Sequence, residues 1–165
     1  MMIDEQHRSI RCETAAETQA CAQQLAKELG AGDVVILEGP LGAGKTTFTQ
    51  GLARGLDVQG RVTSPTFQIA REHHPNGAGP TLIHVDAYRL LEAGEDPLDA
   101  LESLDLITEM DRAVVVAEWG GGMMEQLAES YIHVIIDRTT AVDETPESEA
   151  RIISWRRVDA ARSRG

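Results

Sequence analysis

Short apolar runs and longer amphipathic segments alternate along the chain. Six segments are rich in apolar or β-branched residues, and they are too short for helices or alternate with a period of two, which predicts β-strands. These segments are 33–38, 67–71, 81–85, 113–117, 131–137 and 151–157. Apolar residues recur at helical spacing in 18–29 and 45–56, which predicts amphipathic helices. Strands interleaved with helices are typical of an α/β fold.

Local signals set the boundaries of the first helix. Thr14 followed by Glu17 is a capping-box signature, so we expect the helix to begin there. Gly30 follows the last apolar residue of the repeat and predicts the end of the helix.

Turn-forming residues at 75–80 join the predicted strands 67–71 and 81–85. Such a connection predicts an antiparallel hairpin, which makes the sheet mixed. Further helices are expected at 96–106 and, more weakly, at 123–130.

The strand 33–38 is followed by the sequence GPLGAGKTT, whose last three residues begin the helix 45–56. This sequence fits the P-loop pattern. Its glycines allow backbone N–H groups to point at anionic oxygens, and the helix that follows adds its positive dipole end. Lys45 supplies a cation for the β- and γ-phosphates, and the Thr46 hydroxyl suits Mg²⁺. The predicted nucleotide-binding residues are Leu41, Gly42, Ala43, Gly44, Lys45, Thr46 and Thr47. We therefore expect a three-layer P-loop NTPase fold with a mixed, mainly parallel central sheet flanked by helices.

Two predicted strands end in an acid, Asp86 after TLIHV and Glu118 after AVVVA. Open α/β sheets bind ligands outside the carboxyl ends of their strands, and a P-loop enzyme needs an acid there for Mg²⁺ or water. Glu118 lacks the preceding aspartate of a full Walker B pair. We expect Asp86 and Glu118 to be catalytic, and either acid to hold Mg²⁺ directly or through water.

The nucleotide is expected to be ATP. Asp57 opens a D-x-x-G sequence that resembles a GTPase motif, but it follows a helix, and the chain has no N-K-x-D for guanine. The hydroxyl-rich segment 63–66 lies where switch loops that sense a γ-phosphate are found, although it also fits an ordinary turn.

Composition predicts one globular domain over residues 1–165, with 42% apolar and 25% charged residues. An acidic linker is expected at about 138–150, followed by an edge strand and basic tail at 151–165. The formal charge of −12 disfavours direct binding to DNA or tRNA. The chain shows no signal peptide, no membrane-spanning run and no disulfide framework, so we expect a cytoplasmic protein with reduced thiols.

Four linked motifs, GPLGAGKTT, VTSPTF, HVDAYRL and AEW, closely resemble the TsaE family in their order and spacing. The resemblance covers about residues 14–137. It implies an ATPase that acts with TsaD and TsaB in the threonylcarbamoyladenosine modification of tRNA beside the anticodon, with tRNA contacted only through the complex. It maps the family's Mg²⁺-binding threonine and glutamate onto Thr46 and Glu118. It maps the family's switch segment onto 64–66, which adds Thr66 to Lys45, Asp86 and Glu118 as a candidate catalytic residue. Pro40 stands where many members have aspartate, and the region after residue 137 matches only loosely.

Two other functions fit the P-loop. A small-molecule kinase uses the same phosphate cradle, with the segment 84–86 as an acceptor-binding site, but the chain shows no lid insert of the expected length. A nucleotide-gated binding module without useful turnover is the third interpretation, and the single Walker B acid leaves it open. Turnover with and without partners separates these functions.

Overall fold

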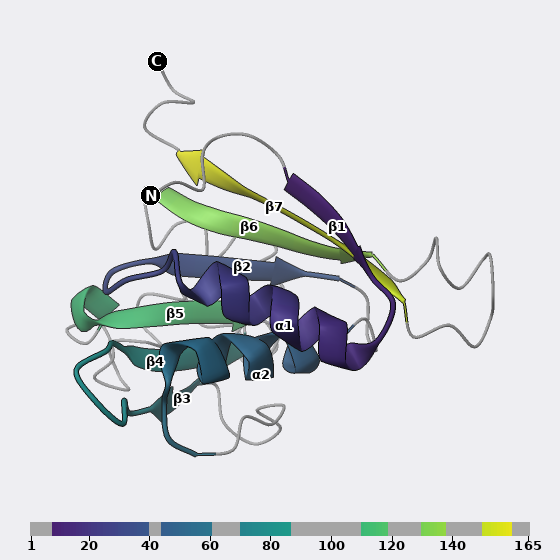
Figure 1. Cartoon of the computed structure of the whole chain (residues 1–165). Helices are drawn as coiled ribbons and strands as arrows, with labels where there is room; N and C mark the ends of the chain where they lie inside the picture. Colours follow the sequence, from purple (N-terminus) through teal and green to yellow (C-terminus); the bar gives the residue numbers. More distant parts are fainter. Residues whose placement is uncertain are drawn as a thin grey trace.

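The computed structural model describes residues 8–39, 44–60, 70–86, 110–118, 130–137 and 150–159. Two α-helices, α1 (Ala15–Ala26) and α2 (Lys45–Leu56), lie together on one face of a seven-stranded sheet (Figure 1). The strands are β1 (Arg8–Cys12), β2 (Val34–Glu38), β3 (Ala70–His73), β4 (Thr81–Asp86), β5 (Ala113–Glu118), β6 (Ser130–Asp137) and β7 (Arg151–Asp159), and the short 3₁₀ helix η1 (Met110–Arg112) precedes β5.

The order of strands across the sheet is β1-β7-β6-β2-β5-β4-β3. Strand β2 pairs in parallel with β6 and β5, and β5 pairs in parallel with β4. Strand β7 runs antiparallel to β6 and β1, and β3 runs antiparallel to β4 as the hairpin pattern predicted. The predicted α/β fold with a mixed, mainly parallel sheet is therefore confirmed.

The core lies between the two helices and the sheet. Strands β2 and β5 are buried along nearly their whole length, as expected for parallel strands covered on both faces. Phe48 and Leu52 of α2 are fully buried in the same core as Leu25 of α1. The helices cross closely because Gly51 and Gly55 of α2 have no side chains at the crossing.

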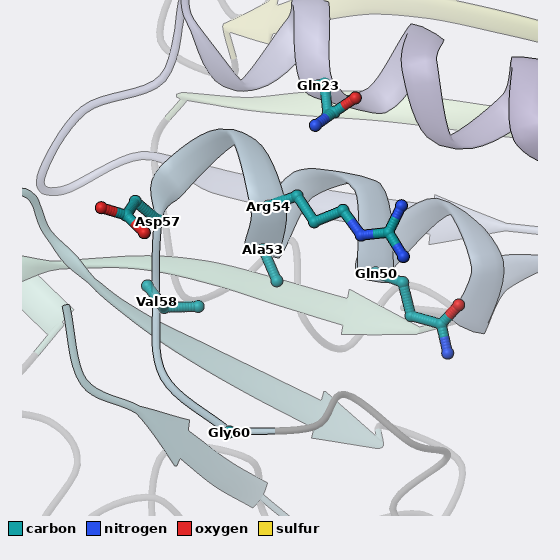
Figure 2. Close-up of a pocket in the computed structure, with 7 residues that line it drawn as sticks. All are labelled: Gln23, Gln50, Ala53, Arg54, Asp57, Val58 and Gly60. Carbon is teal, nitrogen blue, oxygen red and sulfur yellow. The ribbon is translucent and has the colours of Figure 1, made fainter. Parts of the chain in front are cut away.

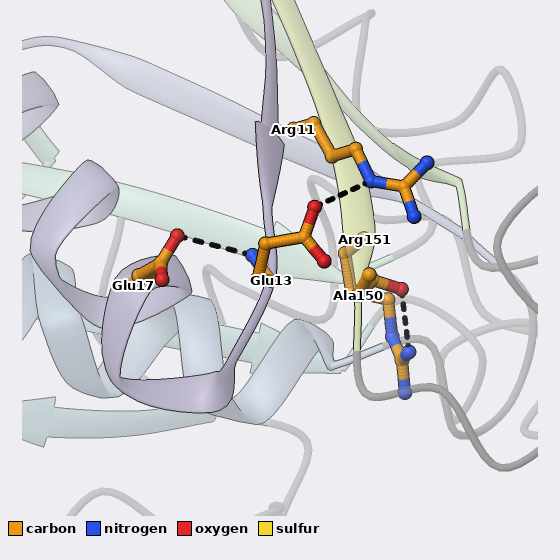
Figure 3. Close-up of polar contacts among 5 residues, drawn as sticks. All are labelled: Arg11, Glu13, Glu17, Ala150 and Arg151. Atoms are coloured by element: carbon orange, nitrogen blue, oxygen red, sulfur yellow. Dashed lines mark hydrogen bonds and ion pairs between the residues drawn. The ribbon is translucent and has the colours of Figure 1, made fainter.

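The first turn of α1 has the predicted cap. The Glu17 amide donates to the Thr14 hydroxyl at 3.1 Å. In return the Glu17 carboxylate accepts from the amide of Glu13, one residue before the cap, and Arg11 donates to the Glu13 carboxylate at 2.7 Å (Figure 3).

Helix α1 ends at Ala26, before the predicted end at Gly30. The Asp33 carboxylate accepts from the Gly30 amide at 2.8 Å, so this glycine belongs to the turn that leads into β2. The apolar repeat continued to Leu29 because that side chain still packs against the core after the helix has ended.

Two expectations about the sheet's outer strands were wrong. Strand β1 was not predicted, and β7 is not an edge strand, because β1 pairs with its residues 151–155. The basic residues of 151–157 do not prevent this pairing, since Arg151 lies opposite Cys12 of β1, while Arg156 and Arg157 lie beyond the part of β7 that pairs with β1.

Several expectations fall outside the described residues. They concern the helix at 96–106, the linker at 138–149 and the tail at 160–165, together with the helix at 123–130 except its last residue, Ser130, which is the first residue of β6. In the part of the chain that is described, no helix has the length and apolar character needed to cross a membrane. Cys12 and Cys21 are free, and burial raises the pKa of Cys21 to about 12, which disfavours its thiolate.

Candidate nucleotide site

Three neighbouring parallel strands, β2, β5 and β4, have their carboxyl ends side by side, and these ends form one edge of the sheet. In the β4–β5 ladder Asp86 lies opposite Glu118, and in the β2–β5 ladder Leu37 lies opposite the same Glu118. The chain leaves β2 through Glu38 and Gly39 and returns at Gly44 as α2. The topology thus brings the two predicted acids to the edge where the P-loop strand ends.

The N-terminus of α2 has no side chain of its own to complete it. The cap residue is Gly44, whose φ of 104° is left-handed and favours glycine. Its carbonyl accepts from the Phe48 amide at 2.9 Å, which starts the helical ladder. No side chain caps the helix, and its described first turn contains no acid. Backbone N–H groups at such a helix start form a site for an anion.

The predicted phosphate ligands at this helix start are partly exposed. Lys45, Thr46 and Thr47 are all half-buried residues of the first turn of α2. Leu41, Gly42, Ala43 and Thr66 lie outside the described residues, so their predicted roles stay predictions.

Glu118 is the buried acid of this edge. The residue is only 8% exposed, and its Oε1 lies 3.3 Å from Nε2 of His84, which is completely buried. The two groups are within ion-pair distance, but they do not have hydrogen-bond alignment, and Oε1 has no other partner among the described residues. From the sequence His84 was considered only within the candidate acceptor-binding segment 84–86, and in the structure its side chain is fully buried.

The alternation of side chains along β4 could have indicated that His84 lies near the two acids. Side chains two apart on a strand share a face, so His84 lies on the same face of β4 as Asp86. Strand β5 then places Glu118 beside both residues.

The donor chemistry at this edge fits Mg²⁺. Thr46 offers a hydroxyl and Glu118 a carboxylate, which are hard oxygen ligands. The described residues contain no group of three or more His, Cys, Asp or Glu side chains that could hold a metal by themselves. Mg²⁺ is usually bound by one or two protein oxygens together with substrate phosphates.

A separate surface cleft of about 660 Å³ lies toward the other end of α2. Its lining comes from Gln23 of α1, from the later turns of α2 and from the segment that follows α2 (Figure 2). Asp57 of the D-x-x-G sequence is in this lining. It is the left-handed C-cap of α2, and its carboxylate accepts from the Asn76 side chain at 2.9 Å. The motif therefore ends a helix and closes a turn, as its position after a helix indicated.

Comparison with known proteins gives one consistent family. The family model described as threonylcarbamoyl adenosine biosynthesis protein TsaE matches residues 12–147. A tRNA threonylcarbamoyladenosine biosynthesis protein TsaE from Streptomyces coelicolor is 53% identical over 125 residues, which cover 76% of this chain and 80% of that protein. The protein of the same name from Mycobacterium tuberculosis is 45% identical over 141 residues, with 84% and 80% covered.

The fold also matches a solved structure. The crystal structure of Bacillus subtilis YdiB aligns with a TM-score of 0.68 and 30% sequence identity, and the alignment covers 95% of this chain and 88% of that one.

Proposed function

The chain belongs to the TsaE family, and from that premise we propose that it is a Mg²⁺-dependent ATPase subunit that acts with TsaD and TsaB in the threonylcarbamoyladenosine modification of tRNA. The observation that carries the ATPase proposal is the start of α2 without a side-chain cap, together with a buried acid on the strand that pairs with β2. Helix α2 begins at Lys45 without a side-chain cap, and the β2–β5 ladder brings Glu118 to the end of the strand that precedes it.

The chemistry follows from these groups. Hydrolysis requires water to attack the γ-phosphorus while its bond to the bridging β–γ oxygen breaks, which releases ADP and phosphate. Lys45 and the backbone amides at the start of α2 stabilise the negative charge on the β- and γ-phosphates. Thr46 and Glu118 would hold Mg²⁺, which neutralises phosphate charge when it is bound. Asp86 lies opposite Glu118 in the ladder. It would position or deprotonate the attacking water, or hold the water shell of the metal.

The partnership rests on the family and on charge. A formal charge of −12 opposes contact with a phosphate backbone, so the tRNA would be held by TsaD and TsaB. The nucleotide can control this association only through different affinities of its two states for the partners. We therefore expect ATP and ADP to give different affinities of the chain for the TsaD–TsaB pair.

The direct test is ATP hydrolysis by the purified chain, alone and with TsaD–TsaB, with small acceptors screened for phosphate transfer. Lys45→Ala serves as the control for contaminating ATPases. We expect slow hydrolysis by the chain alone and faster hydrolysis with the pair. Phosphate transfer to a small acceptor would replace the proposal with the kinase function, and ATP binding without turnover under any condition would replace it with the nucleotide-gated module.

Partner affinity needs its own measurement. Calorimetric titration against TsaD–TsaB would be made with a non-hydrolysable ATP analogue, with ADP and without nucleotide. Equal affinities in all three conditions would remove nucleotide control from the proposal.

A further inference from the structure

A fully buried histidine faces the carboxylate of Glu118. His84 lies on β4 opposite Val116, and Asp86, two residues on, lies opposite Glu118. His84 is 0% exposed, and its Nε2 is 3.3 Å from Oε1 of Glu118. The contact is therefore set by the register of two central strands.

The polar atoms at this contact have no alternative partners in the described structure. Neither ring nitrogen of His84 makes a hydrogen bond there, and neither does Oε1 of Glu118. A buried polar atom without a hydrogen bond is costly, and such groups in a native protein are almost always paired. Hydrogen bonds in ligand-free active sites are often poorly aligned and tighten when the ligand binds.

We propose that His84 is a positioning residue, whose Nε2–H donates to Oε1 of Glu118 and leaves Oε2 for the metal or its water. This inference deepens the proposed ATPase function and rests on it for the catalytic role of Glu118. Carboxylates that bind metals are themselves oriented by hydrogen bonds, and loss of such a bond typically costs about 10–100-fold in metal affinity or activity.

The other buried histidine shows what a structural role looks like. His73 is 3% exposed, and its Nδ1 lies 2.9 Å from the backbone carbonyl of Gln59. His73 thus fixes the chain after α2 through the backbone. His84 has no backbone partner among the described residues and faces the side chain of a predicted catalytic acid.

The first test needs neither nucleotide nor metal. Nitrogen-15 NMR of the imidazole in the ligand-free wild-type protein should show His84 with its proton on Nε2. In Glu118→Gln the resonance of that proton should move upfield, because a neutral acceptor forms a weaker hydrogen bond than a carboxylate. A proton on Nδ1, or an Nε2 proton that does not respond to Glu118→Gln, would overturn the proposal.

The second test separates positioning from packing. His84→Leu should lower ATP turnover by about 10–100-fold, with ATP affinity nearly unchanged. His84→Gln can place an amide N–H near the position of Nε2, so it should retain turnover within about threefold, well short of that loss. In the Glu118→Gln background, His84→Leu should cause no further loss, because the partner through which it acts has been changed.

Two results would contradict the positioning role. One is an equal loss of turnover in His84→Leu and His84→Gln, and the other is a full additional loss from His84→Leu in the Glu118→Gln background. If His84→Leu does not fold, the NMR result and His84→Gln still decide. If the wild-type chain hydrolyses no ATP, the proposed function fails, while the NMR result still decides whether the contact exists.

Discussion

The two helices pack against each other, but their first turns are completed in different ways. Helix α1 is closed by its own side chains, since the Thr14 hydroxyl accepts from the Glu17 amide and the Glu17 carboxylate accepts from the Glu13 amide. Helix α2 begins at a left-handed glycine, Gly44, with no side-chain cap and no acid in its described first turn.

The difference separates a structural helix end from one suited to a ligand. The first amides of any α-helix lack partners within the helix, so they need a side chain, water or a ligand. At α1 the chain supplies the partners and adds a favourable negative charge. At α2 the chain supplies a lysine instead, and a bound triphosphate would be the negative group that completes the turn.

The largest effect is expected from replacing Glu118, the buried acid at the end of β5. Glu118→Gln keeps the shape of the side chain but loses its charge, so ATP turnover should fall at least about tenfold, as for loss of a metal or water ligand. ATP affinity measured by titration should change little. If hydrolysis persists within about threefold of wild type, smaller than any such loss, Asp86 is the principal acid instead.

Adding a side chain at the close crossing of α1 and α2 is expected to destabilise the fold. A Cβ on Gly51 would clash with the Gln19 carbonyl oxygen and would lie 2.7 Å from the Ala22 Cβ. Alanine gains up to about 1 kcal/mol of helix propensity over glycine, but a clash with backbone outweighs this gain. Gly51→Ala should therefore lower the free energy of unfolding by about 1–3 kcal/mol in urea denaturation.

Gly30→Ala is the matched control for this change. A Cβ on Gly30 would meet nothing within 4 Å. The two variants should therefore differ clearly in stability, and equal stabilities would contradict the close crossing of the helices.

Removing the cap of α1 is expected to affect stability alone. Thr14→Ala deletes the oxygen that accepts from the Glu17 amide and should cost about 1 kcal/mol in the same denaturation assay. Thr14→Ser keeps the oxygen and should restore most of the loss. A change of ATP affinity in Thr14→Ala would contradict the claim that the start of α1 has only a structural role.

The smallest effect is expected at the far end of α2, where His73 contacts Gln59. Burial lowers the pKa of His73 below 6.5, although its hydrogen bond to the Gln59 carbonyl acts in the opposite direction. The unfolded chain therefore takes up this proton more readily than the folded one. The stability due to His73 is complete above about pH 6.5 and is lost as the pH falls through the lower folded value.

His73→Gln should flatten this dependence in urea denaturation between about pH 7.5 and pH 5. The difference from wild type cannot exceed about 1.4 kcal/mol per pH unit for one proton. Identical slopes for His73→Gln and wild type would contradict the lowered pKa.

The sequence predicted the centre of the sheet better than its outer strands. Strands β2 and β5 are covered on both faces, so they read as continuous apolar runs. Strand β1 reads RSIRC, and its single large apolar residue, Ile10, is 45% exposed. Half-exposed strands of this kind leave little hydrophobic pattern in the sequence, and β1 is fixed by pairing with residues far along the chain.

The parts of the site that lie within short continuous segments could be predicted from the sequence. The P-loop, its helix and the strand-terminal positions of Asp86 and Glu118 follow from short segments of sequence. The contact between His84 and Glu118 depends on which strand lies beside β4 and in which register. No single segment contains that information, because it arises from long-range pairing of two parallel strands.

Titration calorimetry with Mg²⁺ and ATP on wild type, Lys45→Ala and Thr14→Ala tests the central claim most directly. If the start of α2 holds the triphosphate, Lys45→Ala should weaken ATP binding by at least about tenfold, as expected for loss of a charged hydrogen bond. Thr14→Ala should bind as wild type does, and far-UV circular dichroism should show that all three proteins are folded. Unchanged affinity in a folded Lys45→Ala would contradict the assignment of the ATP site to α2.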